Sequence, residues 1–284
     1  MAWQGGMDMI SNRTEDVPGS VLIFLHIPKA AGTTFHQILD RKYEGKRIVS
    51  IDGLDSGASV QAFKEMPDHE RAAIDLLKGH MPFGLHEYVS SPATYVTFLR
   101  DPVERVISYY YYVCRSPEHY LYDKVTGNNL SLAQFVEAKL TTEVIDFQVK
   151  MIAGKESALR SWQHDPSLLE LAWNNIERYF SVVGFTEYFD QSLLLIKQKL
   201  GWRNSPCYQK RNVTKGRAGI DTIDRNIIGL IREYNSLDCQ LYDWALKRFK
   251  EQLRTAGITD YKVNMFRLLN RFYSAARFCR MKRV

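Results

Sequence analysis

The sequence contains no apolar run long enough to span a bilayer, and its first 20 residues lack the basic stretch followed by an apolar stretch that marks a secretory signal. We therefore expect a soluble, cytoplasmic protein. Cysteine is scarce: the four cysteines are scattered without a CxxC pair, which is not the signature of a zinc site or a disulfide framework. The seven histidines form no HExxH pattern, so the sequence predicts no metal site.

Acidic residues are slightly outnumbered by basic ones, which gives a net charge of +6 and an isoelectric point of about 9.0. This excess suits an anionic ligand and does not require nucleic acid, so we expect no nucleic-acid partner. The 284 residues are 45% hydrophobic, which is enough for one full core. We expect a loose leader over residues 1–20, a single domain over 21–260 and a basic, helical tail over 261–284.

Short apolar runs alternate with helix-like segments along the chain. The runs that predict strands are Val21–Leu25, Arg47–Ser50, Thr94–Leu99 and Ser181–Phe185. The segments that predict helices are Ser59–Leu77, with an interruption near Pro67, then Leu130–Leu140, Thr142–Ile152, Pro166–Phe180 and Thr222–Leu253. Such alternation predicts an α/β protein with a P-loop-like three-layer fold, in which helices flank a central, mostly parallel sheet.

The stretch VLIFLHIPKAAGTT, residues 21–34, joins a buried strand to a helix through a tight turn. The first N–H groups of a helix lack partners and the helix dipole is positive there, so this turn favours a phosphate or sulfate group. Gly32 lets the backbone approach the anion, Lys29 adds a charge, and Thr33 and Thr34 add hydrogen-bond donors. The turn is not a Walker A loop, because Lys29 precedes the only glycine.

A second anion-binding pattern lies in FLRDPVERVISYY, residues 98–110. Arg100 follows a predicted strand, and a helix is expected to begin directly after it, with Asp101 as its N-cap and Pro102 in its first turn. A guanidinium group can bind two phosphate oxygens, and the hydroxyl of Ser108, two turns into the same helix, can bind a third.

Taken together, the two motifs resemble those of sulfotransferases that use 3′-phosphoadenosine-5′-phosphosulfate (PAPS), in particular the heparan and uronosyl 2-O carbohydrate branch. The resemblance implies in-line transfer of a sulfuryl group to a hydroxyl acceptor, a saccharide, with PAP as product and no metal. It implies that Arg100 and Ser108 bind the 3′-phosphate of the nucleotide. The residues that it assigns to the 5′-phosphosulfate are Lys29, Ala30, Ala31, Gly32, Thr33 and Thr34. A late loop resembles one that closes over the nucleotide, with Lys215, Gly216 and Arg217.

The acceptor hydroxyl needs a group that takes up its proton, and a neutral histidine is suited to this near neutral pH. His80 is the first candidate, because Gly79-His80 resembles the Gly-His pair that carries the base in uronosyl 2-O-sulfotransferases. The residues after this pair match only loosely, so His86 and Glu87 remain alternative bases or acceptor ligands. Lys29 is the second catalytic residue, since it can neutralise the bridging oxygen of the leaving group.

Two other classes of function stay open at this point. One is a P-loop kinase-like phosphotransferase, which the missing Gly-Lys-Ser/Thr order and the missing Walker B acid disfavour. The other is a non-catalytic protein that binds an anionic ligand or a membrane surface. Its support is the tail after Asp260, where apolar residues alternate with arginines at roughly helical spacing, so a weak membrane contact through this tail is possible.

Overall fold

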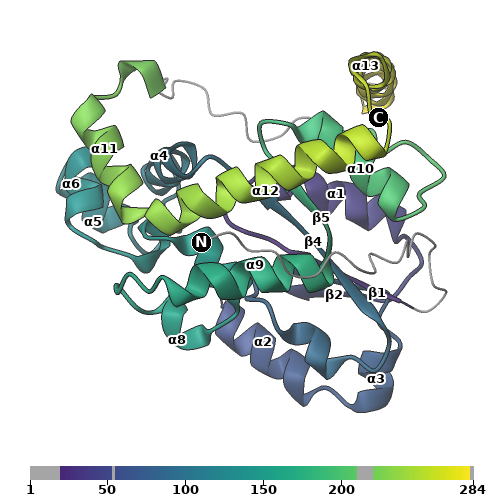
Figure 1. The fold of residues 1–284 in the computed structure, drawn as a ribbon, viewed down its shortest axis with the longest axis horizontal. Coiled ribbons are helices and arrows are strands. Elements are labelled where there is room, and N and C mark those ends of the chain that lie inside the picture. The colour runs from purple at the N-terminus through teal and green to yellow at the C-terminus, as the bar shows by residue number, and fades with distance from the viewer. Residues whose placement is uncertain (1–19, 53–54, 210–219, 282–284) are drawn as a thin grey trace, which may run out of the picture.

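Strand β1 (Val21–Leu25) is the middle strand of a five-stranded sheet, and all five of its residues are buried (Figure 1). The order is β2-β3-β1-β4-β5 and every pairing is parallel, which confirms the predicted sheet. The computed structural model describes residues 20–52, 55–209 and 220–281. The other strands are β2 (Ile48–Ile51), β3 (Leu76–Gly79), β4 (Ala93–Leu99) and β5 (Phe180–Phe185).

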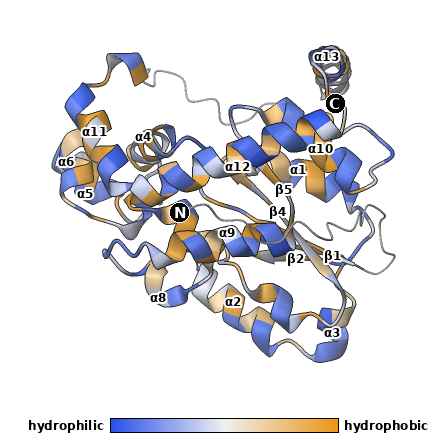
Figure 2. Cartoon of the chain, viewed as in Figure 1, coloured by the Kyte–Doolittle hydropathy of each residue, from blue (hydrophilic) through white to orange (hydrophobic). Residues whose placement is uncertain are grey.

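Helices cover both faces of the sheet, with apolar sides inward and polar sides outward (Figure 2). The α-helices are α1 (Gly32–Lys42), α2 (Ser56–Glu65), α3 (Asp68–Ala72), α4 (Pro102–Val113), α5 (Tyr122–Gly127), α6 (Leu132–Glu137), α7 (Phe147–Ala153), α8 (Glu156–Leu159), α9 (Ser167–Tyr179), α10 (Phe189–Lys199), α11 (Arg225–Tyr234), α12 (Ser236–Thr255) and α13 (Asp260–Met281). The 3-10 helices are η1 (Leu85–Tyr88), η2 (Thr142–Val144) and η3 (Ile220–Thr222).

The register of the strands tells which side chains share a face. Phe24 packs edge to face against Phe35 of α1, so α1 lies on the face to which Phe24 points. Ile23 and Tyr95 are partners in the register and point to the opposite face, because successive residues of a strand alternate. There the ring of Tyr95 contacts Phe83, which in turn contacts Tyr179 at the end of α9. The core therefore fills both sides of the sheet.

The prediction of a helix up to Leu77 is wrong at its end. The helical part closes with α3, and Leu76 and Leu77 belong to β3, where both are fully buried between β1 and β2. A pair of leucines carries no periodicity, so pattern alone does not separate a short buried strand from a helix end. The two helices predicted between 130 and 152 are also shorter: α6 has six residues and α7 has seven.

Two buried carboxylates cap each other's helices. Asp146 precedes α7, and its Oδ1 accepts hydrogen bonds from the N–H groups of Leu237 and Asp238 at the start of α12, at 2.9 and 3.1 Å. Asp238 in turn accepts from the N–H groups of Gln148 and Val149 at the start of α7, at 3.1 and 2.8 Å. Each carboxylate satisfies N–H groups that a helix start leaves without partners. The exchange fixes α7 against α12.

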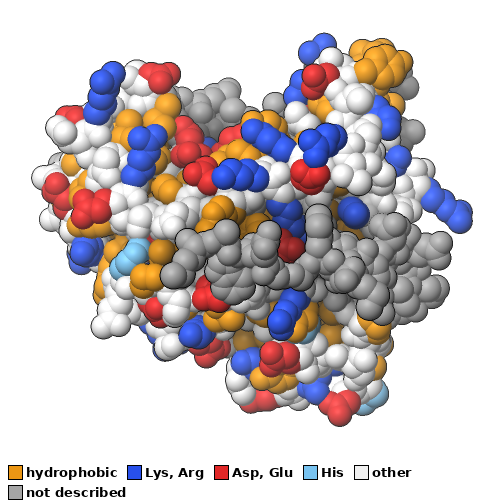
Figure 3. Space-filling model, in the orientation of Figure 1, with side chains coloured by type: hydrophobic (Ala, Val, Ile, Leu, Met, Phe, Trp, Pro, Cys, Tyr) orange, Lys and Arg blue, Asp and Glu red, His pale blue; other side chains and the backbone are white. Residues whose placement is uncertain are grey.

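Helix α13 packs on α10 and is seen end-on in Figure 1. Phe266 is buried, Arg267 pairs with Asp190, and the opposite side exposes several large apolar side chains, namely Tyr261, Met265, Leu268, Leu269 and Phe272. Among the described residues no helix has the length and apolar character that crossing a membrane requires. A weak contact of this tail with a membrane surface stays a prediction. The face seen in Figure 3 mixes basic and acidic side chains.

Candidate active site

Three predicted site segments meet at one edge of the sheet. Leu25 is in register with Gly79 on one side and with Thr97 on the other, so the carboxyl ends of β1, β3 and β4 lie at the same edge. His26, His80 and Arg100 follow these ends directly. Ligands of open parallel sheets bind at this edge, between two neighbouring strands whose following connections run to opposite sides of the sheet. Strands β1 and β4 are such a pair, because β1 leads to β2 on one side and β4 leads to β5 on the other.

The turn between β1 and α1 has an unusual backbone. Lys29 and Ala31 adopt left-handed conformations, with φ of 68° and 59°, which cost energy for residues with a side chain. Gly32 is required here for a reason that the sequence did not reveal. A Cβ atom at this position would lie 1.7 Å from Nε2 of His26, so the imidazole ring occupies the space that any other residue would need.

Replacing Gly32 by alanine is expected to lower the free energy of unfolding by about 1–3 kcal/mol, the usual cost of overpacking. The added methyl group would push His26 or the turn out of place, so, if this turn binds the nucleotide that the sequence predicts, the affinity for PAP should fall as well. Urea unfolding and PAP titration measure the two effects. Gly127→Ala at the end of α5 is the matched control, because within the described part of the chain no atom outside its own helix lies within 4 Å of its Cβ position. Equal stability of the two variants would contradict the steric role of Gly32.

Arg100 joins the ends of β4 and β1. Its Nη1 donates to the carbonyl oxygen of Lys29 at 3.1 Å, and its Nη2 lies 3.1 Å from Oε2 of Glu104 on α4. Gln148 of α7 holds the backbone of Arg100 from the other side. The N–H of Arg100 donates to Oε1 of Gln148 at 3.0 Å, and Nε2 of Gln148 donates to the carbonyl oxygen of Arg100 at 2.9 Å. Both predicted anion-binding turns thus contact each other directly.

Positive charges gather where these turns meet. Nζ of Lys29 lies 3.8 Å from the ring centre of Tyr112 on α4, a cation–π contact. Burial, with the charges of Arg100 and Arg115 as further causes, lowers the pKa of Lys29 to about 8, against a smaller opposing effect of Glu143. The positive charges of these ammonium and guanidinium groups repel one another, and a bound anion would reduce that repulsion. The residues present therefore fit an anionic group such as a phosphate or sulfate.

Ser108 lies within α4 as predicted, whereas Thr33 and Thr34, which were predicted in the turn before the helix, belong to the first turn of α1. Ser108 is buried on α4, one turn after Glu104 on the helix that Arg100 introduces. At the start of α1, Thr34 is buried and Thr33 is exposed. Lys215, Gly216 and Arg217 lie outside the described residues.

His80 lies within a group of three histidines. Its ring centre is 4.1 Å from that of His26, and Nδ1 of His26 lies 3.1 Å from Nε2 of His36 on α1. Burial is the largest effect on all three and lowers the pKa of each, that of His36 to about 4. The backbone of His26 and the carboxylate of Asp52 partly oppose this at His80. A neutral imidazole is the form that accepts a proton, so His80 is suited to act as a base.

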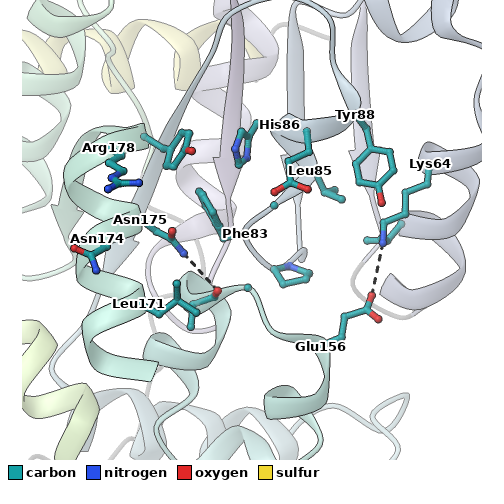
Figure 4. Close-up of a pocket in the computed structure, with 17 residues that line it drawn as sticks. Lys64, Phe83, Leu85, His86, Tyr88, Glu156, Leu171, Asn174, Asn175 and Arg178 are labelled. Atoms are coloured by element: carbon teal, nitrogen blue, oxygen red, sulfur yellow. Dashed lines mark hydrogen bonds and ion pairs between the residues drawn. The ribbon is translucent and has the colours of Figure 1, made fainter. Parts of the chain in front are cut away.

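His86 and Glu87 lie elsewhere. Both line a pocket on the opposite face of the sheet, beside α9 (Figure 4). The hydroxyl of Tyr95 accepts from the N–H groups of Gly84 and His86 and lies 3.1 Å from Nδ1 of His86. Its single proton therefore goes to Nδ1, which leaves the proton of His86 on Nε2. Neither ring nitrogen then has a free lone pair, which favours His80 over His86 as the base.

Three residues of this site escaped the sequence prediction: Gln148, Arg115 and His36. Gln148 is 48 positions from the residue it holds, and nothing local marks that contact. Arg115 did leave a signal. Helix spacing puts Glu104, Ser108 and Tyr112 on one side of α4, and Arg115 lies in the turn that follows the helix, three residues after Tyr112.

Comparisons with known proteins all find similarity to sulfotransferases. A family model described as galactose-3-O-sulfotransferase matches residues 7–281. The chain is 29% identical over 196 residues to galactose-3-O-sulfotransferase 3 of Mus musculus, which covers 64% of this chain and 44% of that protein. It is 25% identical over 279 residues to heparan-sulfate 6-O-sulfotransferase 1 of Cricetulus griseus, which covers 82% of this chain and 68% of that one. The chain thus spans less than half the length of the first relative.

Two further similarities were found. Galactosylceramide sulfotransferase of Bos taurus is 28% identical over 249 residues, which is 79% of this chain and 56% of that protein. Among solved structures, mouse sulfotransferase SULT7A1 complexed with PAP matches with a TM-score of 0.38 and 14% identity, covering 79% of this chain and 66% of that one.

Proposed function

Because the chain belongs to the galactose-3-O-sulfotransferase family, we propose that it transfers a sulfuryl group from PAPS to a hydroxyl group of a saccharide. The observation that carries the proposal is the contact between the two anion-binding turns, in which the Arg100 guanidinium bonds the Lys29 carbonyl at 3.1 Å. One nucleotide with a phosphate at each end can reach both turns only when they lie side by side. Family membership also argues against the kinase-like alternative.

The co-substrate would bring an already activated sulfuryl group, so the tasks of the protein are to bind, to neutralise charge and to take up a proton. Lys29 provides the charge that neutralises the bridging oxygen on the leaving side. The N–H groups at the start of α1, with Thr33 and Thr34, hold the 5′-phosphosulfate oxygens. Arg100 and Ser108 hold the 3′-phosphate, and Arg115 adds a third positive charge to the same region.

His80 takes the proton of the acceptor hydroxyl in this proposal. It follows β3, which neighbours β1, and its ring contacts that of His26, which packs over Gly32 at the start of α1. The base and the anion-binding turn are therefore connected through one imidazole ring. His36 positions that ring by its contact with Nδ1 of His26.

Replacing Arg100 by alanine is expected to weaken PAP binding roughly 10- to 100-fold, which corresponds to the loss of one or two hydrogen bonds to a charged group. Binding of 5′-AMP, which has no 3′-phosphate, should change much less. Calorimetric titration of both nucleotides measures the difference. Arg254→Ala on the exposed side of α12 is the control, since it removes the same charge from a surface pair. Equal losses for the two nucleotides would contradict the assignment of Arg100 to the 3′-phosphate.

The function itself is tested by transfer of ³⁵S from labelled PAPS. The acceptors to compare are galactosides, galactosylceramide and unsulfated heparan chains, because the similar proteins are named for these three classes. We expect transfer to at least one of them and preferential binding of PAP over ATP with Mg²⁺. Tight binding of ATP with Mg²⁺, with no transfer from PAPS to any acceptor, would refute the proposal.

A further inference from the structure

We propose that the pocket beside α9 is a second saccharide-binding site, separate from the transfer centre and specific for neutral sugars. It has a volume of about 490 Å³ and lies among α2, η1 and the carboxyl-terminal half of α9 (Figure 4). This is the size of a small-ligand site. Nothing in the proposed transfer reaction requires the pocket, so the inference goes beyond that function.

The position of the pocket separates it from the transfer centre. Tyr95, whose hydroxyl bonds His86 in the pocket wall, is level with Leu77 in the sheet, because both are in register with Ile23. Leu77 comes three residues before His80, which is about 10 Å along a strand. Tyr95 also points to the face opposite α1, whereas the ring of His80 contacts that of His26, which contacts α1. The two sites lie on opposite faces of the sheet.

The wall of the pocket is fixed before any ligand arrives. The Tyr95 hydroxyl accepts from the N–H groups of Gly84 and His86, at 3.3 and 3.0 Å, and the N–H of Phe83 donates to the carbonyl oxygen of Met151 at 2.9 Å. Gly154 is packed so closely that a Cβ there would lie 2.5 Å from the carbonyl oxygen of Phe83. A wall held in this way loses little entropy when it binds a ligand.

Hydrogen-bonding groups on the pocket surface have capacity to spare. His86 carries its proton on Nε2, as argued above, and can donate it. Among the residues that the structure describes, the side chains of Asn174, Arg178 and Glu87 form no hydrogen bond or ion pair, and Figure 4 shows Asn174 and Arg178 on the α9 side. Amide, guanidinium and carboxylate groups together offer donors and acceptors in planar pairs, which suit vicinal hydroxyl groups.

Charge and aromatic content then select the class of ligand. Lys64 and Arg178 are balanced by Glu87 and Glu156, and Lys64 already pairs with Glu156 at 4.0 Å. The pocket therefore has no excess charge with which to attract an anion. Tyr88 and Tyr179 add aromatic surface to the wall, and Lys64 Nζ lies 5.3 Å from the ring centre of Tyr88, so the other side of that ring is the apolar surface against which the C–H groups of a sugar can pack. A neutral, hydroxyl-rich ring meets both conditions.

The test measures, by saturation-transfer NMR, the binding of two neutral tetrasaccharides to the full chain with PAP present. The two are lacto-N-tetraose and cellotetraose. We expect binding of at least one of them, with little dependence on salt because no net charge is involved. Arg178→Ala and Tyr88→Ala should each raise Kd roughly tenfold or more, the effect of losing one well-made contact. Both side chains are at the surface, so neither change should disturb folding.

Arg254→Ala is the matched control, and PAP affinity measured in every variant reports on the transfer centre. Binding that persists in both pocket variants, or that falls steeply with salt, overturns the proposal while PAP binding and the proposed function stand. Failure of the wild-type chain to bind PAP would instead count against the proposed function. If Arg178→Ala also raises KM for long acceptors, the neutral saccharide is a distal part of the acceptor chain. If KM is unchanged, it is a separate glycan.

Discussion

Replacing Lys29 by methionine is expected to lower kcat about 10²- to 10³-fold, the usual loss when one preorganised charge is removed from a transition state. Methionine keeps much of the length and apolar stem of lysine, and it can still pack on Tyr112, which the ammonium group contacts at 3.8 Å. The loss should therefore appear in turnover and not in folding. Transfer of ³⁵S at saturating PAPS and acceptor measures it.

The pH dependence of the wild-type reaction gives an independent reading of the same residue. Because the pKa of Lys29 is lowered to about 8, the free protein has the ammonium group below that pH and loses it above. We expect kcat/KM for PAPS to fall as pH rises through this range. Bound phosphate groups favour the charged form, so the fall in kcat should come at higher pH. The methionine variant should lack this fall.

Lys46→Met is the control for both measurements, because Lys46 is an exposed lysine that pairs with Asp75 at the surface. It removes one positive charge without touching the edge of the sheet where the strands end. If the two lysine variants lost turnover to the same extent, the effect would come from net charge, and Lys29 would have no part in the chemistry.

Replacing His80 by alanine is expected to lower kcat about 10²- to 10⁴-fold, the range for loss of a general base. Affinity for PAP should change little, since the proposed function assigns the nucleotide to the turns that begin at Lys29 and Arg100. Burial keeps His80 neutral near pH 7 by lowering its pKa, so the wild-type imidazole is ready to accept a proton there. Turnover and PAP titration on the same preparation separate the two effects.

Two further histidine variants make this result specific. His69→Ala changes an exposed histidine of α3 and should leave turnover as it is. His86→Ala tests the alternative base in the pocket beside α9. A large loss of kcat in His86→Ala together with normal turnover in His80→Ala would transfer the role of base to His86.

Much of the fold could be predicted because its main signals are local. A run such as Val21–Leu25, apolar at every position, is fully buried as the middle strand of a parallel sheet. The N-cap role of Asp101 was also predictable, and its Oδ1 accepts from the N–H of Glu104 at 2.9 Å. Since both turns follow such strands, their meeting at one edge follows from parallel pairing.

Other parts depend on contacts between distant residues and could not be predicted. Strand β3 has four residues, and only its position between β1 and β2 makes Leu76 and Leu77 a strand. Gln148 looks like any polar residue of a helix, yet it is buried because it bonds the backbone of Arg100. The contact between the rings of His26 and His80 likewise joins two loops that are far apart in the sequence.

The crossed capping of α7 and α12 imposes an order of assembly on the growing chain. Gln148 can hold the backbone of Arg100 in place only when the start of α7 is itself fixed. The carboxylate that fixes it belongs to Asp238, which is translated some ninety residues later. During synthesis the two anion-binding turns therefore emerge early but acquire their final rigidity late. We therefore expect a fragment that stops before α12 to contain both turns and still bind a nucleotide weakly.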